Sequence, residues 1–321
     1  MKTKWIVSLA FGLPVAALAS LEQKSPPTPP ANASNPPLVW DVVPEQEAAF
    51  PRNFRTTGDT LKAVKGVMPS AAGLAQLHAS GSAEFTADGL KAMLAKLSGP
   101  VTIFDLRQED HGFVNGSAVS WYGTNNWANV GKSPEEVSTD EERRLGSCAV
   151  GSDVAIPTDA AIKDPAAAAP AEKVKIRNVM DEKQLVTAAG ASYVRIPVPD
   201  HCRPTDAAVD QFVQAVRALP DGAWAHFHCR AGKGRTTTFL VLYDMLRNAR
   251  EVPLQDIVNR QSALIGDYNV LSAEPGSDAD ATWKTGVAAD RAAFVRAFYD
   301  YARANPNGSP QLWSEWLKTQ P

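Results

Sequence analysis

The sequence predicts an α/β fold in which helices flank a mainly parallel sheet. Apolar runs at residues 101–104, 193–196 and 223–227 are typical of buried strands, and helical patterns alternate with them. Such alternation is typical of parallel sheets, which bind ligands beyond the carboxyl ends of their strands. The predicted strands are followed by a carboxylic acid or a thiol, namely Asp105, Asp200 and Cys229. We therefore expect a functional site at that edge of the sheet.

Five helices are predicted around these strands. Apolar residues recur at helical spacing over residues 85–97, 207–219, 236–246, 254–265 and 290–305. Residues 123–174 interrupt this organisation, because they contain few apolar runs and include an Ala/Pro-rich patch. We expect residues 38–122 and 175–321 to form the core, with 123–174 as an inserted small domain.

The first residues are predicted to be a secretion signal. Two lysines precede an apolar run over residues 5–16, and Ala17-Leu18-Ala19 is a small-x-small cleavage site. The run is too short to span a bilayer, and no other segment is a credible membrane span, so we expect no stable membrane association. Residues 1–19 are predicted to be the signal peptide and the Pro-rich residues 20–37 a flexible leader. The mature protein is expected to be exported, periplasmic or secreted, after cleavage near Ala19.

The composition excludes several classes of protein. The 321 residues are 44% hydrophobic and 21% charged, enough for a sizeable core. The net charge of -3 excludes an overall basic protein, so no nucleic-acid partner is expected, and a polyanion would need local clusters of Lys and Arg. Three cysteines form neither a disulfide scaffold nor a zinc motif, so no metal or other cofactor is predicted. Cys148 and Cys202 could pair in an oxidising compartment.

The segment from His228 to Thr236 has the residues that a thiol-based phosphate site needs. Gly232 and Gly234 let backbone N–H groups turn inward to bind an anion, and the following helix adds its positive end. Arg235 follows Cys229 by six residues and can grip two phosphoryl oxygens. This positive surrounding favours a thiolate, so Cys229 is the predicted nucleophile.

Three more residues complete the predicted chemistry. The hydroxyl of Thr236 can hydrogen-bond the sulfur and ease its departure, and His228 can orient the loop from behind. Asp200 follows a strand in a Pro-flanked loop and is predicted to protonate the leaving oxygen and then activate water. A further polar cluster is expected to support the cysteine loop, consisting of Asp105, Arg107, Glu109 and His111. For His111 a solvated loop is an equal alternative.

Several motifs are similar to those of the bacterial protein-tyrosine-phosphatase-like phytases, or cysteine phytases. They are His226-Phe227-His228-Cys229, residues 234–237, Tyr193-Val194-Arg195-Ile196 with Asp200-His201, residues 105–112, residues 119–123 and residues 313–318. The resemblance covers roughly residues 38–321. It implies a tyrosine-phosphatase core with a small, mostly β inserted domain. It also implies stepwise hydrolysis of myo-inositol hexakisphosphate without a metal.

The resemblance also implies roles for single residues. Cys229 would be the nucleophile, Arg235 the phosphate clamp, Asp200 the general acid, and His201 a substrate contact. Loop residues would also bind substrate, namely Arg230, Ala231, Gly232, Lys233 and Gly234. A basic ring would hold the non-reacting phosphates, formed by Arg55, Lys284, Arg291 and Lys163. For each residue of the ring a solvated surface charge is the alternative. Ala288 stands where the family has an aromatic residue.

The same cysteine loop is also compatible with other functions. A protein-tyrosine phosphatase would use the same catalytic residues without a basic ring, and a phosphoinositide phosphatase would need a membrane-binding surface. A protein that only binds inositol phosphates would not need the intact Cys229, Arg235 and Asp200. Cys202 could also form a reversible disulfide with Cys229. The sequence makes no prediction of oligomeric state.

Overall fold

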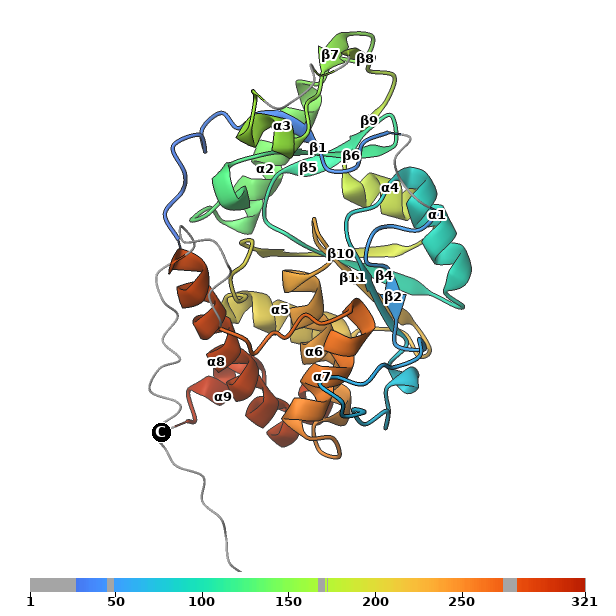
Figure 1. Cartoon of the computed structure of the whole chain (residues 1–321), viewed down its shortest axis with the longest axis vertical. Coiled ribbons are helices and arrows are strands. Elements are labelled where there is room, and N and C mark those ends of the chain that lie inside the picture. Colours follow the sequence, from blue (N-terminus) through green and yellow to red (C-terminus); the bar gives the residue numbers. More distant parts are fainter. Residues whose placement is uncertain (1–26, 45–48, 167–170, 172, 274–281, 321) are drawn as a thin grey trace, which may run out of the picture.

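The computed structural model describes residues 27–44, 49–166, 171, 173–273 and 282–320. The predicted signal peptide, residues 1–19, lies outside the described residues. Two sheets stack along the long axis of the molecule, and most helices pack below the larger one (Figure 1). No described helix is both long and apolar enough to cross a membrane.

The larger sheet has five strands in the order β10-β4-β11-β3-β2. They are Ser192–Val198, Val101–Arg107, Trp224–His228, Ala79–Ser82 and Arg55–Thr56. The first four strands are parallel and the short β2 pairs antiparallel with β3. The sheet is therefore mixed but mainly parallel, and each of the three predicted strands is present. Because His228 pairs in register with Asp105, the carboxyl ends of β11 and β4 lie level.

Helices cover both faces of this sheet. One face carries α5, α6, α7, α8 and α9, which are Asp206–Arg217, Gly234–Asn248, Leu254–Ile265, Thr282–Ala304 and Trp313–Leu317. The other face carries α1 and α4, which are Ala87–Lys96 and Glu182–Ala188. Side chains alternate along a strand, so Phe104 packs toward the first group and Ile103 toward the second. The five helices predicted from the sequence are all present.

The smaller sheet is antiparallel, in the order β1-β6-β5-β9. Its strands are Leu38–Trp40, Ser117–Trp121, His111–Val114 and Val179–Met180. It therefore uses strands from outside residues 123–174, and the small β unit is larger than the predicted insertion. The β5–β6 hairpin turns at Asn115 and Gly116, which both have positive φ. An Asn-Gly pair is the usual two-residue hairpin turn, and this signal in the sequence was missed.

Residues 123–174 contribute mainly helices to this unit. They contain α2, Pro134–Gly146, which starts with a capping box at Ser133, and the short α3, Asp159–Lys163. The strands β7, Asp153–Ala155, and β8, Lys173–Lys175, pair antiparallel at the upper end of Figure 1, and α3 lies between them in sequence. Part of the predicted leader also contacts this unit, because Asn32 accepts a bond from the backbone N–H of Thr124.

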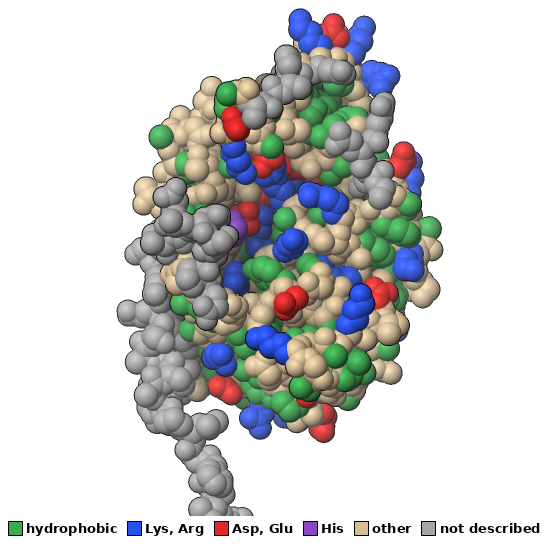
Figure 2. Space-filling model, in the orientation of Figure 1, with side chains coloured by type: hydrophobic (Ala, Val, Ile, Leu, Met, Phe, Trp, Pro, Cys, Tyr) green, Lys and Arg blue, Asp and Glu red, His purple; other side chains and the backbone are tan. Residues whose placement is uncertain are grey.

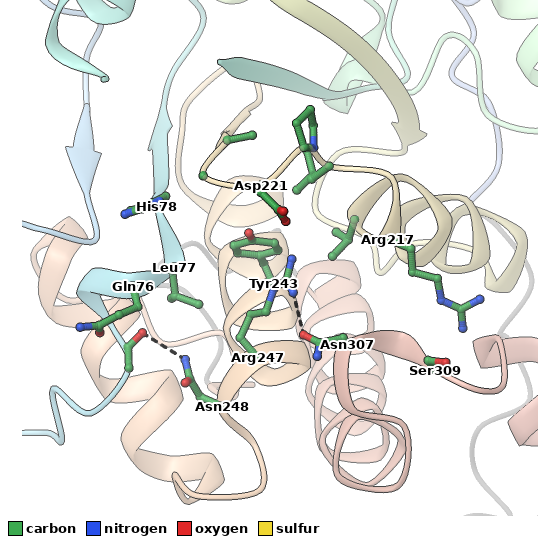
Figure 3. A pocket seen from close by; sticks show the side chains of 16 residues that line it. Gln76, Leu77, His78, Arg217, Asp221, Tyr243, Arg247, Asn248, Asn307 and Ser309 are labelled. Atoms are coloured by element: carbon green, nitrogen blue, oxygen red, sulfur yellow. Dashed lines mark hydrogen bonds between the residues drawn. The ribbon is translucent and has the colours of Figure 1, made fainter. Parts of the chain in front are cut away.

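A cavity of about 680 Å³ lies at the amino-terminal ends of β3 and β11, away from the predicted site. Among its lining residues are His78, Arg217, Asp221, Tyr243 and Arg247 (Figure 3). No residue predicted for the functional site lines it.

Candidate active site

Cys229 stands at the carboxyl end of β11, in the loop that leads into α6. Its side chain is buried, and the Thr236 hydroxyl donates to its Sγ at 3.2 Å. Gly232 has a φ of 68°, and a Cβ there would lie 2.3 Å from the backbone nitrogen of Ala83. Only glycine fits at this position, because both the backbone conformation and the space exclude a side chain.

Arg55 holds the loop from behind. Its guanidinium is 2% exposed and donates to the Gly232 carbonyl at 3.0 Å and to Thr237 Oγ1 at 3.0 Å. Nearby, the amide of Asn53 donates to the Ala231 carbonyl at 2.8 Å. Burial lowers the pKa of Arg55 to about 10, although the Cys229 thiolate opposes this shift. Nη1 also donates to the Asn53 carbonyl, so both terminal nitrogens of Arg55 support the loop and its surroundings. The contact of Arg55 with a non-reacting phosphate stays a prediction.

Arg235 lies buried beside Cys229 in the first turn of α6. Two of its nitrogens pair with the Glu109 carboxylate, at 2.7 and 2.9 Å, and Nη2 lies 3.3 Å from Asp200 Oδ1. Burial alone would lower the pKa of Arg235, but Asp200 and Glu109 raise it well above its usual range. A permanent, preoriented cation therefore stands beside the thiol.

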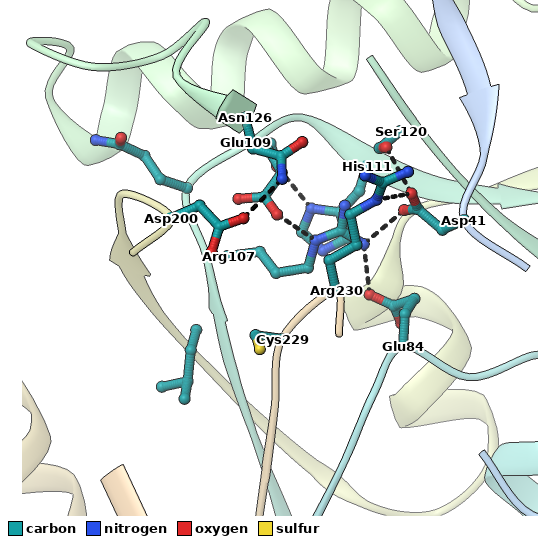
Figure 4. A network of polar contacts seen from close by, with 12 residues as sticks. Asp41, Glu84, Arg107, Glu109, His111, Ser120, Asn126, Asp200, Cys229 and Arg230 are labelled. Carbon is teal, nitrogen blue, oxygen red and sulfur yellow. Dashed lines mark hydrogen bonds and ion pairs between the residues drawn. The ribbon is translucent and has the colours of Figure 1, made fainter. Parts of the chain in front are cut away.

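Asp200 follows β10 and is fixed by groups from the smaller unit. Asn126 Nδ2 donates to Asp200 Oδ2 at 2.7 Å (Figure 4). Trp127 Nε1 donates to the Asp200 carbonyl at 2.9 Å. The His201 backbone N–H donates to Asp200 Oδ1 at 3.0 Å, and His201 itself has a φ of 67°. This bent backbone keeps the Asp200 carboxyl beside Arg235.

His201 and Arg291 lie next to this acid loop. The ring of His201 packs edge-on against Trp283, and burial lowers the pKa of His201. Arg291 is buried, donates to the His201 carbonyl at 3.3 Å, and faces the Tyr268 ring. The guanidinium of Arg291 therefore holds the acid loop, and its predicted contact with substrate stays a prediction.

Beneath the loop lies a buried network of charges (Figure 4). Arg107 Nη1 lies 2.6 Å from Glu84 and 2.8 Å from Asp41, and Arg107 Nε lies 3.0 Å from Glu109. Burial would lower the pKa of Arg107, but these carboxylates hold it well above its usual range. Arg107 and Glu109 thus connect the cysteine loop's clamp to the smaller sheet, where the sequence predicted a supporting cluster.

Two buried histidines belong to the same network. His228 Nε2 lies 2.7 Å from Glu182 Oε1, and His111 Nε2 lies 3.0 Å from Glu182 Oε2 and 3.3 Å from Asp105. Burial would lower the pKa of His228, but Glu182 and Glu84 raise it to about 9. Burial would also lower the pKa of His111, but its acidic neighbours, chiefly Asp105, raise that pKa well above the usual value. His111 is therefore an ion-paired core residue, and the solvated-loop alternative is wrong.

Carboxylates and imidazoles gather closely enough here to resemble metal sites. Two such sets are Glu84 with His111 and Glu182, and Asp105 with Glu182 and His228. All five side chains are buried and contact one another directly: His228 Nε2 lies 2.7 Å from Glu182 Oε1, and His111 Nε2 lies 3.0 Å from Glu182 Oε2. In this structure both sets are therefore joined by imidazole–carboxylate contacts.

Basic side chains surround the hollow above the cysteine loop (Figure 2). Arg230 pairs with Asp41 at 2.5 Å and with Asp159 at 3.1 Å, and Lys163 pairs with the same Asp159 at 3.0 Å. Both cations also face the ring of Tyr122, at 5.6 and 5.2 Å. The predicted contacts Arg230 and Lys163 are therefore already neutralised in part by acidic neighbours.

The other predicted loop and ring residues differ in exposure. Lys233 and Ala231 are exposed, Gly234 is half-buried at the start of α6, and Lys284 is half-buried with its ammonium 5.6 Å from the Trp283 ring. All three cysteines are free thiols, so the possible Cys148–Cys202 and Cys202–Cys229 disulfides are not formed in this structure. Burial raises the pKa of Cys202 to about 12.

Sequence reasoning missed residues that hold the predicted ones. They are Asp41, Glu84, Asn126, Trp127, Asp159 and Glu182. Only the Asn125-Asn126 pair had a local signal, because asparagine favours left-handed turns, and both residues have φ near 60°. The buried acids are distant in sequence from their partners, so no local pattern marks them.

Comparisons with known proteins agree with this geometry. A family model for PTP-like phytases, whose description is inositol hexakisphosphate, matches residues 104–247. A PTP-like phytase structure from Bdellovibrio bacteriovorus is 38% identical with a TM-score of 0.74, covering 92% of this chain and 98% of that one. A Mitsuokella multacida PTP-like myo-inositol phosphatase, solved with myo-inositol-(1,3,4,5)-tetrakisphosphate, is 37% identical with a TM-score of 0.79.

That comparison covers 88% of this chain and 49% of the Mitsuokella chain. The effector protein HopD2 of Pseudomonas syringae pv. tomato is 33% identical over 282 residues, which is 87% of this chain and 59% of HopD2. The chain thus spans about half to three fifths of these two longer relatives and nearly all of the Bdellovibrio protein.

Proposed function

The chain belongs to the protein-tyrosine-phosphatase-like phytases, and from that premise we propose that it is an exported phosphatase that uses Cys229 to remove phosphates stepwise from myo-inositol hexakisphosphate. The observation that carries the proposal is the buried thiol of Cys229 beside a preoriented Arg235, with Asp200 directed at the same point. No step of the proposed reaction uses a metal or cofactor.

In the first step, the Cys229 thiolate attacks phosphorus, and the bond from phosphorus to the inositol oxygen breaks. Asp200 gives its proton to that oxygen, while Arg235 and the loop N–H groups hold the phosphoryl oxygens. In the second step, water loses a proton to Asp200 and attacks the phosphocysteine. The S–P bond breaks, phosphate leaves, and the Thr236 hydroxyl stabilises the returning thiolate.

The charge around the pocket supports a polyanionic substrate. Lys233 is exposed on the loop, Lys284 stands by the acid loop, and Lys163 reaches over the mouth with 57% of its side chain exposed. The net charge of the chain is negative, so attraction of a polyanion would depend on these local basic side chains. The Mitsuokella relative was solved with an inositol tetrakisphosphate.

The test is phosphate release at about pH 5, where a carboxylic acid and a thiolate can coexist, with EDTA and reductant present. The substrates are inositol hexakisphosphate and a phosphotyrosine peptide. The active-site variant is Cys229→Ser, and Cys148→Ser, a thiol beyond α2, is the matched control. We expect fast release from the inositol phosphate, abolished only by Cys229→Ser. Release from the peptide alone would make the chain a protein-tyrosine phosphatase, and tight binding without release would make it a binding protein.

We also propose export, because the first 19 residues have the form of a signal peptide. Expression of the full chain in a Gram-negative host, followed by N-terminal sequencing of the periplasmic fraction and the medium, tests this proposal. A mature chain beginning at Ser20 is expected. Full-length protein retained in the cytoplasm would contradict export.

A further inference from the structure

Asn126 bonds the proposed general acid without belonging to the sheet that carries it. Its Nδ2 donates to Asp200 Oδ2 at 2.7 Å, and its side chain is buried. The carbonyl oxygen of the same amide is buried and has no hydrogen-bond partner among the described residues. A buried acceptor without a donor destabilises the fold, so an asparagine at this position points to function more than to stability.

The turn that carries Asn126 fixes the position of its side chain. Residues Asn125 and Asn126 both have left-handed backbones, with φ of 60° and 59°. The next residue, Trp127, is buried, packs edge-on against Trp283, and donates to the Asp200 carbonyl. The turn therefore fixes both the backbone and the carboxyl of Asp200.

The two Asp200 oxygens have different surroundings. Oδ1 accepts the His201 backbone N–H at 3.0 Å and lies 3.3 Å from Arg235 Nη2, whereas Oδ2 accepts the Asn126 amide at 2.7 Å. The donors on Oδ1 come from the acid loop itself and from α6, and the donor on Oδ2 comes from the turn before α2. With a donor on each oxygen, the carboxyl cannot rotate freely about its Cβ–Cγ bond. Loss of the Asn126 donor would free Oδ2 and allow the carboxyl to turn away from the position beside Arg235.

We propose that Asn126 is the positioning residue of the general acid: through its bond to Oδ2 it fixes the rotation of the Asp200 carboxyl beside Arg235. This inference rests on the proposed function, because it assigns Asp200 the role of acid. It goes further by placing one determinant of catalysis in the turn before α2, outside the phosphatase sheet.

The test compares leaving groups. Inositol phosphates leave as poor alkoxides and need the acid, whereas p-nitrophenyl phosphate has a good leaving group and needs it little. The variants are Asn126→Gly, which keeps the left-handed turn, and Asn126→Asp, which keeps the shape without the donor. Asn125→Gly is the matched control in the same turn. Because kcat/KM reports formation of the phospho-enzyme, it is measured for both substrates over a range of pH.

We expect both Asn126 variants to lose about 100-fold in kcat/KM for inositol hexakisphosphate and less than about threefold for p-nitrophenyl phosphate, since general acids contribute about 10²- to 10⁴-fold. Asn125→Gly should change neither. In an Asp200→Asn background, Asn126→Gly should cause no further loss, because it acts through Asp200. An equal loss on both substrates, or a full additional loss in the Asp200→Asn background, would overturn the proposal.

The test of Asn126 does not depend on which substrate is the natural one. If the wild-type protein hydrolyses no inositol phosphate, the proposed substrate fails, and an alkyl ester such as glycerol phosphate then tests Asn126 in its place. Urea unfolding of each variant checks the fold. An unfolded Asn126→Gly would leave Asn126→Asp as the deciding variant.

Discussion

Glu109 is the buried anion that pairs with Arg235, the proposed phosphate clamp. Its carboxylate pairs twice with Arg235, at 2.7 and 2.9 Å, and once with Arg107, at 3.0 Å. Burial would raise the pKa of Glu109, but the two arginines hold it well below its usual range. Glu109→Gln keeps the shape of the side chain and removes its charge, so it tests this ion pair without creating a cavity.

The expected loss in free energy of unfolding depends on the ion pairs that Arg235 and Arg107 keep when Glu109 is neutral. Removing one partner of a buried ion pair costs about 3 to 5 kcal/mol in free energy of unfolding. Arg235 keeps Asp200 at 3.3 Å, and Arg107 keeps Asp41 and Glu84 at 2.8 and 2.6 Å. We therefore expect the lower end, about 3 kcal/mol. A small displacement of Arg235 should also lower kcat/KM by about 100-fold.

Urea unfolding and steady-state kinetics measure these two effects. Glu142→Gln, on the exposed face of α2, is the matched control and should behave like the wild type. A loss below about 1 kcal/mol for Glu109→Gln would refute the reasoning, because that is the range of an exposed ion pair. Unchanged kcat/KM would show that Arg235 does not need Glu109 for its orientation.

Three further predictions concern the loop and its surroundings. Thr236→Val removes the bond to the Cys229 sulfur, so breakdown of the phosphocysteine should slow by about 10-fold or more and the intermediate should accumulate in rapid-quench experiments; no accumulation would contradict this role. Because the pKa of His228 is raised to about 9, its pairing stabilises the fold fully below about pH 6.5 and is lost as pH rises through 9. About 3 kcal/mol of unfolding free energy should therefore disappear over that range, and a flat profile would count against the Glu182 ion pair. Asp159→Asn frees two cations at the pocket mouth, so the KM for inositol hexakisphosphate should fall several-fold and rise more steeply with salt; a raised KM would mean that Asp159 mainly holds these cations in place.

The position of the cysteine loop between a strand and a helix could be predicted because its information is local. An apolar strand, a thiol, two glycines and Arg235 lie within a dozen residues, and a parallel sheet dictates where such a loop faces. The partners of that loop could not be predicted in the same way. Glu182 lies 71 residues from His111 in sequence, and nothing around either residue marks the pair.

Arg55 and Arg291 show a second limit of sequence reasoning. A motif can place a guanidinium near a phosphate site, but the same five donors also satisfy backbone carbonyls. In the structure Arg55 bonds Gly232 and Arg291 bonds His201, so both guanidinium groups support loops beside the site. The direction of a side chain depended on contacts across the fold, which the spacing of residues does not contain.

The pairing of Arg107 has a consequence for how the chain unfolds. Its partners Asp41 and Glu84 come from the segment after β1 and the segment after β3, so the buried charge lies where the two sheets meet. If the smaller sheet detached alone, Arg107 would lose Asp41 while still surrounded by the larger unit's core. Such a half-open state is unfavourable, and the two sheets therefore form one cooperative unit that is lost in a single transition.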